Sequence, residues 1–367
     1  MQEQATNPLK ENPEGIFAFQ WHITDNCDQR CKHCYIFAED REKILVSMDF
    51  DQMREVIVRC DAFTAELDMR PLFYITGGDP ILCRDFWRLA ELMKEQKRPF
   101  AMMGNPFHLT EEVCKRLKDC GCVAYQVSVD GTEQTHDWFR KPGSYQKTLE
   151  VLPIISRAGM EAVVMMTVSE KNYRELGNVM DAVEAAGADA FSFTRYVPTS
   201  EEKHNLIPPM DYRALLDTFA RKRREAFVRG SFTRFPLKDH LLTLYFYEEG
   251  KFHPPAYCHK PGDHMPAGCH CANGNLAILP DGTVMACRRA EGSELGNVFT
   301  DDLMQMWDRA TRTYRQYAKY EVCNRCKLAP WCRGCPAVAC GTTGDYFSGD
   351  PQCWHVVEEL ETEGSTT

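Results

Sequence analysis

The sequence predicts an α/β fold: an open barrel of six strand–helix units, followed by a cysteine-rich extension. From about residue 16 to 230, short runs rich in β-branched and aromatic residues alternate six times with helical patterns. Such alternation predicts a parallel sheet with helices outside it. Beyond the last unit, ten of the 18 cysteines lie between Cys258 and Cys353. Because six units do not complete an eight-stranded barrel, we expect a partial (β/α)6 barrel.

Composition and charge indicate a globular chain and exclude several functions. The 367 residues carry 53 acidic and 43 basic side chains, a formal net charge of −10, which disfavours non-specific nucleic-acid binding. No apolar run approaches the roughly 18 residues of a membrane span, and the N-terminal residues are too polar for a secretory signal. We therefore expect a cytoplasmic protein that binds neither nucleic acid nor membrane.

The barrel elements follow from hydrophobic periodicity and from residues that begin or end helices. We expect strands at 16–23, 72–76, 100–103, 123–129, 162–168 and 191–197. We expect helices at 48–67, 84–97, 110–120, 144–158, 171–187 and 210–229. The candidate N-caps are Ser47, Thr110 and Ser144, and the glycines expected to end helices are Gly121, Gly159 and Gly187.

The composition changes after the barrel. Prolines interrupt residues 231–257, which we interpret as a linker between a barrel at 16–230 and an extension at 258–367, with residues 1–15 as an N-terminal tail. In the extension, Asp281-Gly282 predicts a β-hairpin with strands at 276–279 and 284–286. The extension has few large apolar residues for its length, so we expect bound metal to supply much of its stability.

Chemically distinctive residues follow the predicted strands, at the edge where parallel α/β folds place their chemistry. In strand order they are Cys27-x3-Cys31-x2-Cys34, Gly77-Gly78-Asp79-Pro80, Asn105, Ser128 with Asp130, and Arg195 on the sixth strand. We expect Asn105 and Arg195 to face the strand-end cavity and to contact substrate. The agreement across several strands predicts one active site at this edge.

The first three cysteines predict a metal site. In a reducing compartment, clustered cysteines are more often metal ligands or redox groups than disulfides. Thiolates separated by three and two residues can converge on one iron–sulfur cluster, leaving one iron of a four-iron cluster open. Zinc is the alternative, but a structural zinc site needs a fourth ligand, and only His22 or His33 is near. The scattered cysteines, which we interpret as small core residues, are Cys60, Cys83, Cys114, Cys120 and Cys122.

On these residues the sequence resembles the radical S-adenosylmethionine (SAM) superfamily, and more narrowly its subgroup with a SPASM extension. The likeness rests on the cysteine motif from Cys27 to Cys34 with Tyr35 after it, paired with Gly77-Gly78-Asp79-Pro80, and spans residues 16 to 355. It implies that Cys27, Cys31 and Cys34 hold a [4Fe-4S] cluster. That cluster would bind SAM and cleave it reductively to a 5′-deoxyadenosyl radical.

The resemblance also implies which side chains receive SAM. By position they are His33 for the adenine, Gly77, Gly78 and Asp79 for the methionine amino group, Ser128 and Asp130 for the ribose, and Arg140 for the methionine carboxylate. Asp79 stands where the family more often has glutamate, one methylene longer. The chemistry agrees, because a guanidinium suits a carboxylate and an acid suits an ammonium group.

The later cysteines resemble the SPASM series and imply two auxiliary [4Fe-4S] clusters, three clusters in all. We expect the nearer one on Cys258, Cys269, Cys287 and Cys335, and the farther one on Cys323, Cys326, Cys332 and Cys353. Ten cysteines exceed the eight that two such clusters need. Cys271 is an alternative upstream ligand, and Cys340 has no assigned partner. A pair of zinc ribbons is the alternative to the clusters.

The resemblance implies an oxidoreductase that abstracts a hydrogen atom from its substrate. We expect it to modify a ribosomally made peptide oxidatively, forming a thioether or carbon crosslink, with a reductant such as flavodoxin or ferredoxin. Only about 15 residues precede the first strand, so we expect any leader-binding module to be a separate protein.

Three alternatives stand beside peptide modification. Two are enzymatic: a sulfatase-type protein maturase, and a haem-pathway enzyme that decarboxylates side chains of a small molecule. The third is a non-catalytic iron–sulfur electron carrier. The strand-end residues Gly77, Asp79, Ser128 and Arg140 disfavour the carrier, because electron transfer alone needs no such pocket.

Overall fold

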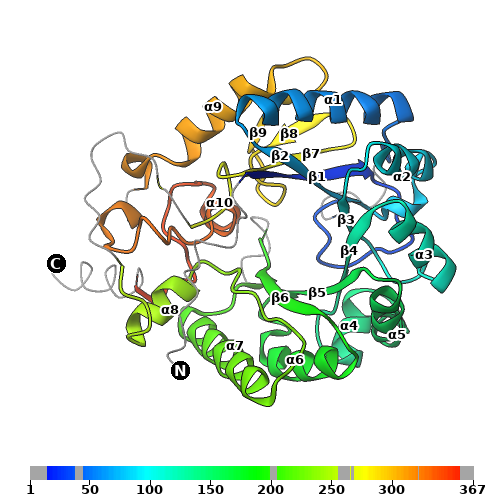
Figure 1. Ribbon diagram of the computed structural model, residues 1–367. Helices are drawn as coiled ribbons and strands as arrows, with labels where there is room; N and C mark the ends of the chain where they lie inside the picture. The colour runs from blue at the N-terminus through cyan, green and yellow to red at the C-terminus, as the bar shows by residue number, and fades with distance from the viewer. Residues whose placement is uncertain are drawn as a thin grey trace.

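The computed structural model describes residues 15–37, 44–198, 205–254, 265, 268–320 and 322–355. Its barrel half is a curved, parallel sheet of six strands, as predicted (Figure 1). The strands are β1 (Ile16–Thr24), β2 (Arg70–Gly77), β3 (Phe100–Met103), β4 (Cys122–Ser128), β5 (Glu161–Val168) and β6 (Ala190–Arg195). They lie side by side in chain order, each parallel to the next, so their carboxyl ends meet at one edge.

Helices cover the outer side of this curved sheet (Figure 1). They are α1 (Phe50–Glu66), α2 (Phe86–Glu95), α3 (Glu111–Asp119), α5 (Ser144–Arg157), α6 (Leu176–Ala185) and α7 (Pro209–Arg229), close to the predicted ranges. A further helix, α4 (Glu133–Phe139), follows β4 and was not predicted. Short 3₁₀ turns lie at Pro80–Leu82, Tyr173–Glu175, Tyr317–Lys319 and Cys323–Arg325.

The helix boundaries confirm some of the predicted caps and show that others are wrong. Thr110 caps α3, and the predicted glycines Gly121, Gly159 and Gly187 follow their helices with positive φ angles. The N-cap of helix α1 is Asp49 instead of Ser47, because Asp49 and Gln52 form a reciprocal capping box. Ser144 is the first residue of α5 and not its cap, which is Gly143.

The extension continues the same sheet. Strands β7 (Asn275–Ile278) and β8 (Thr283–Met285) form the predicted hairpin, and β9 (Glu294–Asn297) adds a third strand. Strand β7 also pairs in parallel with β1, which the sequence did not predict. This pairing covers the edge of the barrel sheet that β1 would otherwise leave open. The two halves therefore share one nine-stranded sheet, in the order β6-β5-β4-β3-β2-β1-β7-β8-β9.

Packing of three further helices joins the two halves. Trp307 of α9 (Leu303–Tyr314) contacts Phe17 of β1 and Phe63 of α1, with ring centroids 5.0 and 6.3 Å apart. Helix α8 (Leu242–Glu248) lies inside the predicted linker, and Tyr245 donates a hydrogen bond to Asp217 of α7 at 2.7 Å. The third is α10 (Pro336–Thr343), whose Gly341 lies so close to the Pro198 carbonyl beyond β6 that a Cβ would collide with it.

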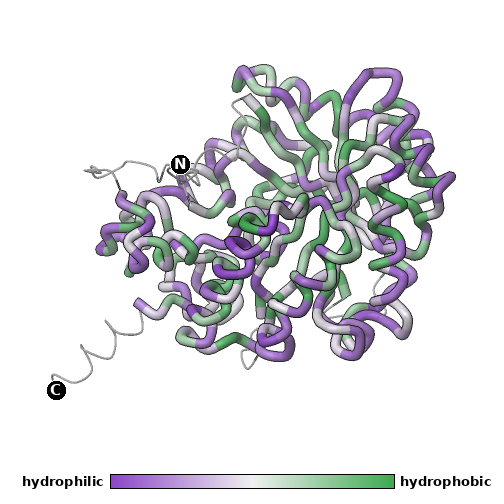
Figure 2. The backbone as a smooth tube through the Cα atoms, turned by 60° about the horizontal axis from the view of Figure 1, so that its bottom comes forward, coloured by the Kyte–Doolittle hydropathy of each residue, from purple (hydrophilic) through white to green (hydrophobic). Residues whose placement is uncertain are grey.

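Hydrophobic residues follow the strands at the centre of the molecule, and hydrophilic residues lie mainly around the outside (Figure 2). The core includes Phe17, Phe19 and Trp21 of β1, all fully buried. The five scattered cysteines are also buried, as expected for small core residues. Among the described residues, none of the helices combines the length and apolar character needed to span a bilayer.

Candidate active site and cluster sites

The first three cysteines lie on the loop that leaves the carboxyl end of β1. Cys27, Cys31 and Cys34 are each half-buried, and none forms a disulfide with another described cysteine. A tight turn shapes the loop, in which the Cys34 N–H donates to the Cys31 carbonyl at 3.1 Å. Burial raises the pKa of the Cys27 thiol to about 11, so binding a metal there would release a proton.

The Gly77-Gly78-Asp79 segment packs directly against the backbone that precedes Cys27. The Gly78 N–H donates to the Thr24 carbonyl at 2.8 Å, and the Asp79 N–H donates to the Asn26 carbonyl at 2.7 Å. A Cβ atom on Gly77 would collide with the Thr24 carbonyl, and one on Gly78 with that of Asn26. Glycine is therefore required at both positions for this close approach, which joins the end of β2 to the cysteine loop.

Asp79 places an unpaired acceptor beside the cysteine loop. Its Oδ1 accepts a hydrogen bond from the Ile81 N–H at 3.2 Å, while its buried Oδ2 has no hydrogen bond to any described residue. Burial raises the pKa of this carboxyl to about 6. A buried carboxylate oxygen without a donor fits an ammonium group, such as the amino group of SAM.

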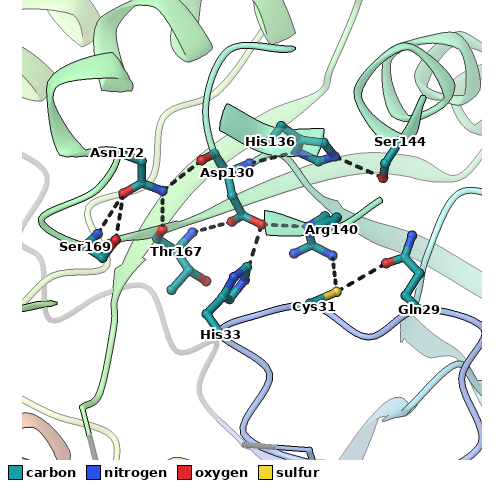
Figure 3. A network of polar contacts seen from close by, with 10 residues as sticks. All are labelled: Gln29, Cys31, His33, Asp130, His136, Arg140, Ser144, Thr167, Ser169 and Asn172. Atoms are coloured by element: carbon teal, nitrogen blue, oxygen red, sulfur yellow. Dashed lines mark hydrogen bonds and ion pairs between the residues drawn. The ribbon is translucent and has the colours of Figure 1, made fainter. Parts of the chain in front are cut away.

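Asp130, just beyond β4, is the centre of a polar network (Figure 3). It is fully buried, and its Oδ2 accepts from Arg140 Nε at 2.6 Å and lies 3.3 Å from His33 Nε2. Although burial raises the pKa of Asp130, the Arg140 guanidinium and the contact with His33 outweigh it and hold the pKa well below its usual range. Arg140 also contacts the cysteine loop, since its Nη1 donates to Cys31 Sγ at 3.8 Å.

A second ring of contacts holds Asp130 in place (Figure 3). Its Oδ1 accepts from the Thr167 N–H at 2.9 Å, and its carbonyl accepts from Asn172 Nδ2 at 2.8 Å. His136 Nδ1 accepts from the Asp130 N–H at 3.1 Å, and its Nε2 lies 3.0 Å from Ser144 Oγ. These partners were not predicted from the sequence, because Thr167 and Asn172 belong to no recognisable motif.

Two further strand-end predictions are Asn105 and Ser128, and the first of them contacts the cysteine loop. Asn105 Nδ2 donates to Asp28 Oδ1 at 2.7 Å and lies 4.0 Å from Cys27 Sγ, so this side chain braces the cysteine loop. Ser128 is half-buried at the end of β4, and its side chain makes no hydrogen bond to a described residue. Their contacts with substrate and ribose remain predictions.

The later cysteines gather in two groups whose members interact electrostatically. One group contains Cys269, Cys271, Cys287 and Cys335. The other contains Cys323, Cys326, Cys332 and Cys353. Burial raises the pKa of the Cys340 thiol, and the charges that add to this rise come from Asp345 and Glu291 and not from another cysteine. Each group supplies four sulfur donors, the set that a four-iron cluster takes.

Cys258 lies outside the described residues, so the choice between Cys258 and Cys271 as a ligand of the nearer cluster remains open.

Arg333 lies between Cys332 and Cys335 in the sequence. Its side chain fixes the loop that carries Cys269 and Cys271. This fully buried guanidinium donates to the carbonyls of Cys269 and Cys271 at 2.8 and 2.7 Å, and to Tyr320 Oη at 3.0 Å. It also contacts the Tyr314 carbonyl. Its position inside Cys332-x2-Cys335 could have marked Arg333 as a functional residue, because an arginine beside several thiolates offsets their charge.

Comparisons with known proteins agree with this site. The family model described as Radical SAM superfamily matches residues 21–183, and the SPASM model, an iron–sulfur cluster-binding domain, matches residues 269–336. The fold resembles that of anSMEcpe with bound AdoMet (TM-score 0.71, 18% identity, 95% of this chain and 97% of that one). It also resembles Streptococcus suis SuiB (TM-score 0.68, 18% identity, 93% and 77%).

Three curated relatives match along most of the chain. An AdoMet-dependent heme synthase of Methanosarcina barkeri is 25% identical over 345 residues, 91% of this chain and 95% of the relative. One of Nitratidesulfovibrio vulgaris is 26% identical over 343 residues, 91% and 90%. The mycofactocin maturase MftC of Mycobacterium ulcerans is 26% identical over 352 residues, 91% and 86%.

Residues 21–183 therefore form a radical SAM domain. Residues 269–336 form a SPASM domain, which is an iron–sulfur cluster-binding domain. The orphaned Asp79 oxygen and the grouped cysteines fit the cofactors of an enzyme with these domains, SAM and [4Fe-4S] clusters.

Proposed function

We propose that this radical SAM enzyme decarboxylates carboxylate side chains of a tetrapyrrole in the haem pathway. The observation that carries the proposal is similarity along nearly the whole chain, extension included, to two AdoMet-dependent heme synthases. This similarity favours the haem-pathway alternative over our first expectation of peptide modification. We also propose three [4Fe-4S] clusters, one on Cys27, Cys31 and Cys34 and one on each later cysteine group.

An arginine between the cluster sites supports a substrate that carries carboxylates. Arg288 follows Cys287, and its guanidinium stacks over the ring of Tyr35, which follows Cys34, at 4.5 Å. The side chain is half-buried, its Nε has no hydrogen bond, and it forms no ion pair with a described acidic residue. A half-buried guanidinium without a carboxylate partner is suited to receive one from a ligand.

The chain's own residues would orient the reactants and exclude water. When bound, the clusters supply the electron that cleaves SAM and accept an electron from the substrate. Asp79 would hold the SAM amino group, and Arg288 a substrate carboxylate. Converting a propionate to a vinyl group removes one hydrogen atom and one electron and releases carbon dioxide, so the reaction needs both a hydrogen abstractor and an electron acceptor.

Peptide modification is the second candidate, favoured by the similarity to the mycofactocin maturase. A non-catalytic electron carrier is disfavoured, because it would need neither the buried Asp79 acceptor nor the close-packed glycines.

The test is anaerobic incubation with SAM, dithionite and iron coproporphyrin III, a porphyrin with propionate side chains. We expect carbon dioxide release and a vinyl product, detected by mass spectrometry. Arg288→Ala should weaken porphyrin binding about tenfold, the effect of losing one charged hydrogen bond. Arg312→Ala, on the surface of α9, is the matched control. SAM cleavage without any change in the porphyrin would reject the proposal.

A further inference from the structure

Arg195, the last residue of β6, is held by two carboxylates from distant parts of the chain. Its Nε lies 2.8 Å from Asp239 Oδ2, and its Nη1 lies 2.6 Å from Asp350 Oδ2. Its guanidinium also faces the ring of Tyr212, 5.2 Å from the centroid. Arg195 and Asp350 are each only 2% exposed. These internal partners engage two nitrogens of Arg195, while its buried Nη2 has no hydrogen bond to a described residue, and the expected contact of Arg195 with substrate stays a prediction.

Asp350 contacts both later cysteine groups. Its Oδ2 accepts from the Cys335 N–H at 2.8 Å, a contact with the nearer group. In the farther group, its carbonyl accepts from the Cys353 N–H at 3.0 Å. Gly334 makes this arrangement possible, because a Cβ there would collide with Asp350. One aspartate therefore fixes the backbone of two cysteines, one in each group.

A second arginine ties the same strand end to another cysteine of the nearer group. Arg289, two residues after Cys287, donates from Nη1 to Thr194 Oγ1 at 2.6 Å and to the Arg195 carbonyl at 2.8 Å. Beyond β6, the Pro198 carbonyl lies so close to Gly341 of α10 that a Cβ on Gly341 would collide with it. The carboxyl end of β6 is thus joined to the extension at several points.

We propose that Arg195 and Asp350 are positioning residues that fix both auxiliary cluster sites against the last barrel strand, and that their charges set the reduction potential of the nearer cluster. The inference rests on the proposed placement of clusters in the two cysteine groups. Charge near an iron–sulfur cluster and hydrogen bonds around its sulfurs control its potential. Because the pair is buried, solvent screens these charges weakly.

The two charges act in opposite directions on a cluster that gains an electron. Arg195→Met leaves the Asp350 carboxylate unpaired beside Cys335, which disfavours reduction and lowers the potential. Asp350→Asn removes that negative charge and leaves Arg195 with Asp239 alone, which raises the potential. Damage to the fold without an electrostatic effect would not produce opposite signs in the two variants.

The test is a redox titration followed by electron paramagnetic resonance on the full-length, reconstituted protein. Cys27→Ala, Cys31→Ala and Cys34→Ala are combined so that only auxiliary clusters contribute. We expect one auxiliary signal to move to lower potential in Arg195→Met and to higher potential in Asp350→Asn. The double variant should return it toward the starting value. Arg98→Met, which breaks the Arg98–Asp61 ion pair elsewhere in the barrel, should move neither signal.

Three results of this titration would contradict the inference or the cluster placement on which it rests. Unchanged signals in both variants, or shifts of the same sign, would overturn the inference. If either variant loses its auxiliary iron, Arg195→Lys, which keeps the charge, should retain iron and a potential near that of the parent. An altered potential or lost iron in Arg195→Lys would contradict the inference. No auxiliary signal even with Arg195 and Asp350 intact would instead reject the proposed cluster placement.

Discussion

Asp130 and Arg140 form a buried ion pair, 2.6 Å from Oδ2 to Nε, and Arg140 reaches from this pair to Cys31. One carboxylate thereby orients both an arginine and His33 beside the first cluster loop. Removing one partner of a buried pair leaves the other charge uncompensated, at a cost of roughly 3 kcal/mol.

Asp130→Asn should therefore abolish most SAM cleavage without exposing the hydrophobic core. The substitution keeps the shape of the side chain but removes the charge that holds Arg140 and His33. We expect at least a tenfold loss of 5′-deoxyadenosine formation with dithionite, and a lower melting temperature. Glu133→Gln, on the exposed side of α4, serves as the control. Full cleavage activity in Asp130→Asn would show that the network does not position the SAM site.

The buried His136 should make the protein less stable as the pH falls below 6.5. Burial lowers its pKa to about 4, so the folded state keeps it neutral while the unfolded chain binds a proton from about pH 6.5 downward. Stability is therefore lost as the pH falls from 6.5 toward 4, by about 2 kcal/mol at pH 5. Anaerobic melting curves should show a smaller loss for His136→Gln, and an identical pH profile for both proteins would refute this assignment.

The pH dependence of SAM binding should report on Asp79. Because its pKa is raised to about 6, the carboxylate that would accept an ammonium group is present above that pH and protonated below it. SAM affinity should therefore fall as the pH drops from 7 to 5. Asp79→Asn should lower affinity at pH 7 by about tenfold or more and remove the pH dependence. Equilibrium dialysis under anaerobic conditions measures both effects. A pH-dependent affinity that persists in the variant would assign the titration to another group.

Iron content should separate the cysteines that hold clusters from those that do not. The proposed clusters require about twelve irons per chain, four in each. Cys335→Ala changes the nearer group and Cys332→Ala the farther group. Each variant should lose about four irons. Cys340→Ala, whose thiol lies outside both groups, should retain the full content. Cys258→Ala and Cys271→Ala, measured in parallel, identify the remaining ligand of the nearer cluster. Zinc in place of iron would support the zinc-ribbon alternative.

Local sequence patterns predicted the barrel and the residues at its strand ends, but not the contacts between distant segments. Periodicity located all six barrel strands, and Asp281-Gly282 located the β7–β8 hairpin. Pairing of β7 with β1 depends on an open sheet edge, which no local pattern shows. Arg195 was placed correctly at the end of β6, but Asp350 lies 155 residues away and was not foreseeable as its partner. Helix α4 is a single short element between β4 and α5, too brief for a periodic pattern.

The most direct test of the central claim follows a hydrogen atom from substrate to cofactor. Iron coproporphyrin III deuterated on its propionate chains is incubated anaerobically with the reconstituted protein, SAM and dithionite. Our account predicts deuterium in 5′-deoxyadenosine, together with carbon dioxide release and a vinyl product. Unlabelled 5′-deoxyadenosine and an unchanged porphyrin would contradict it.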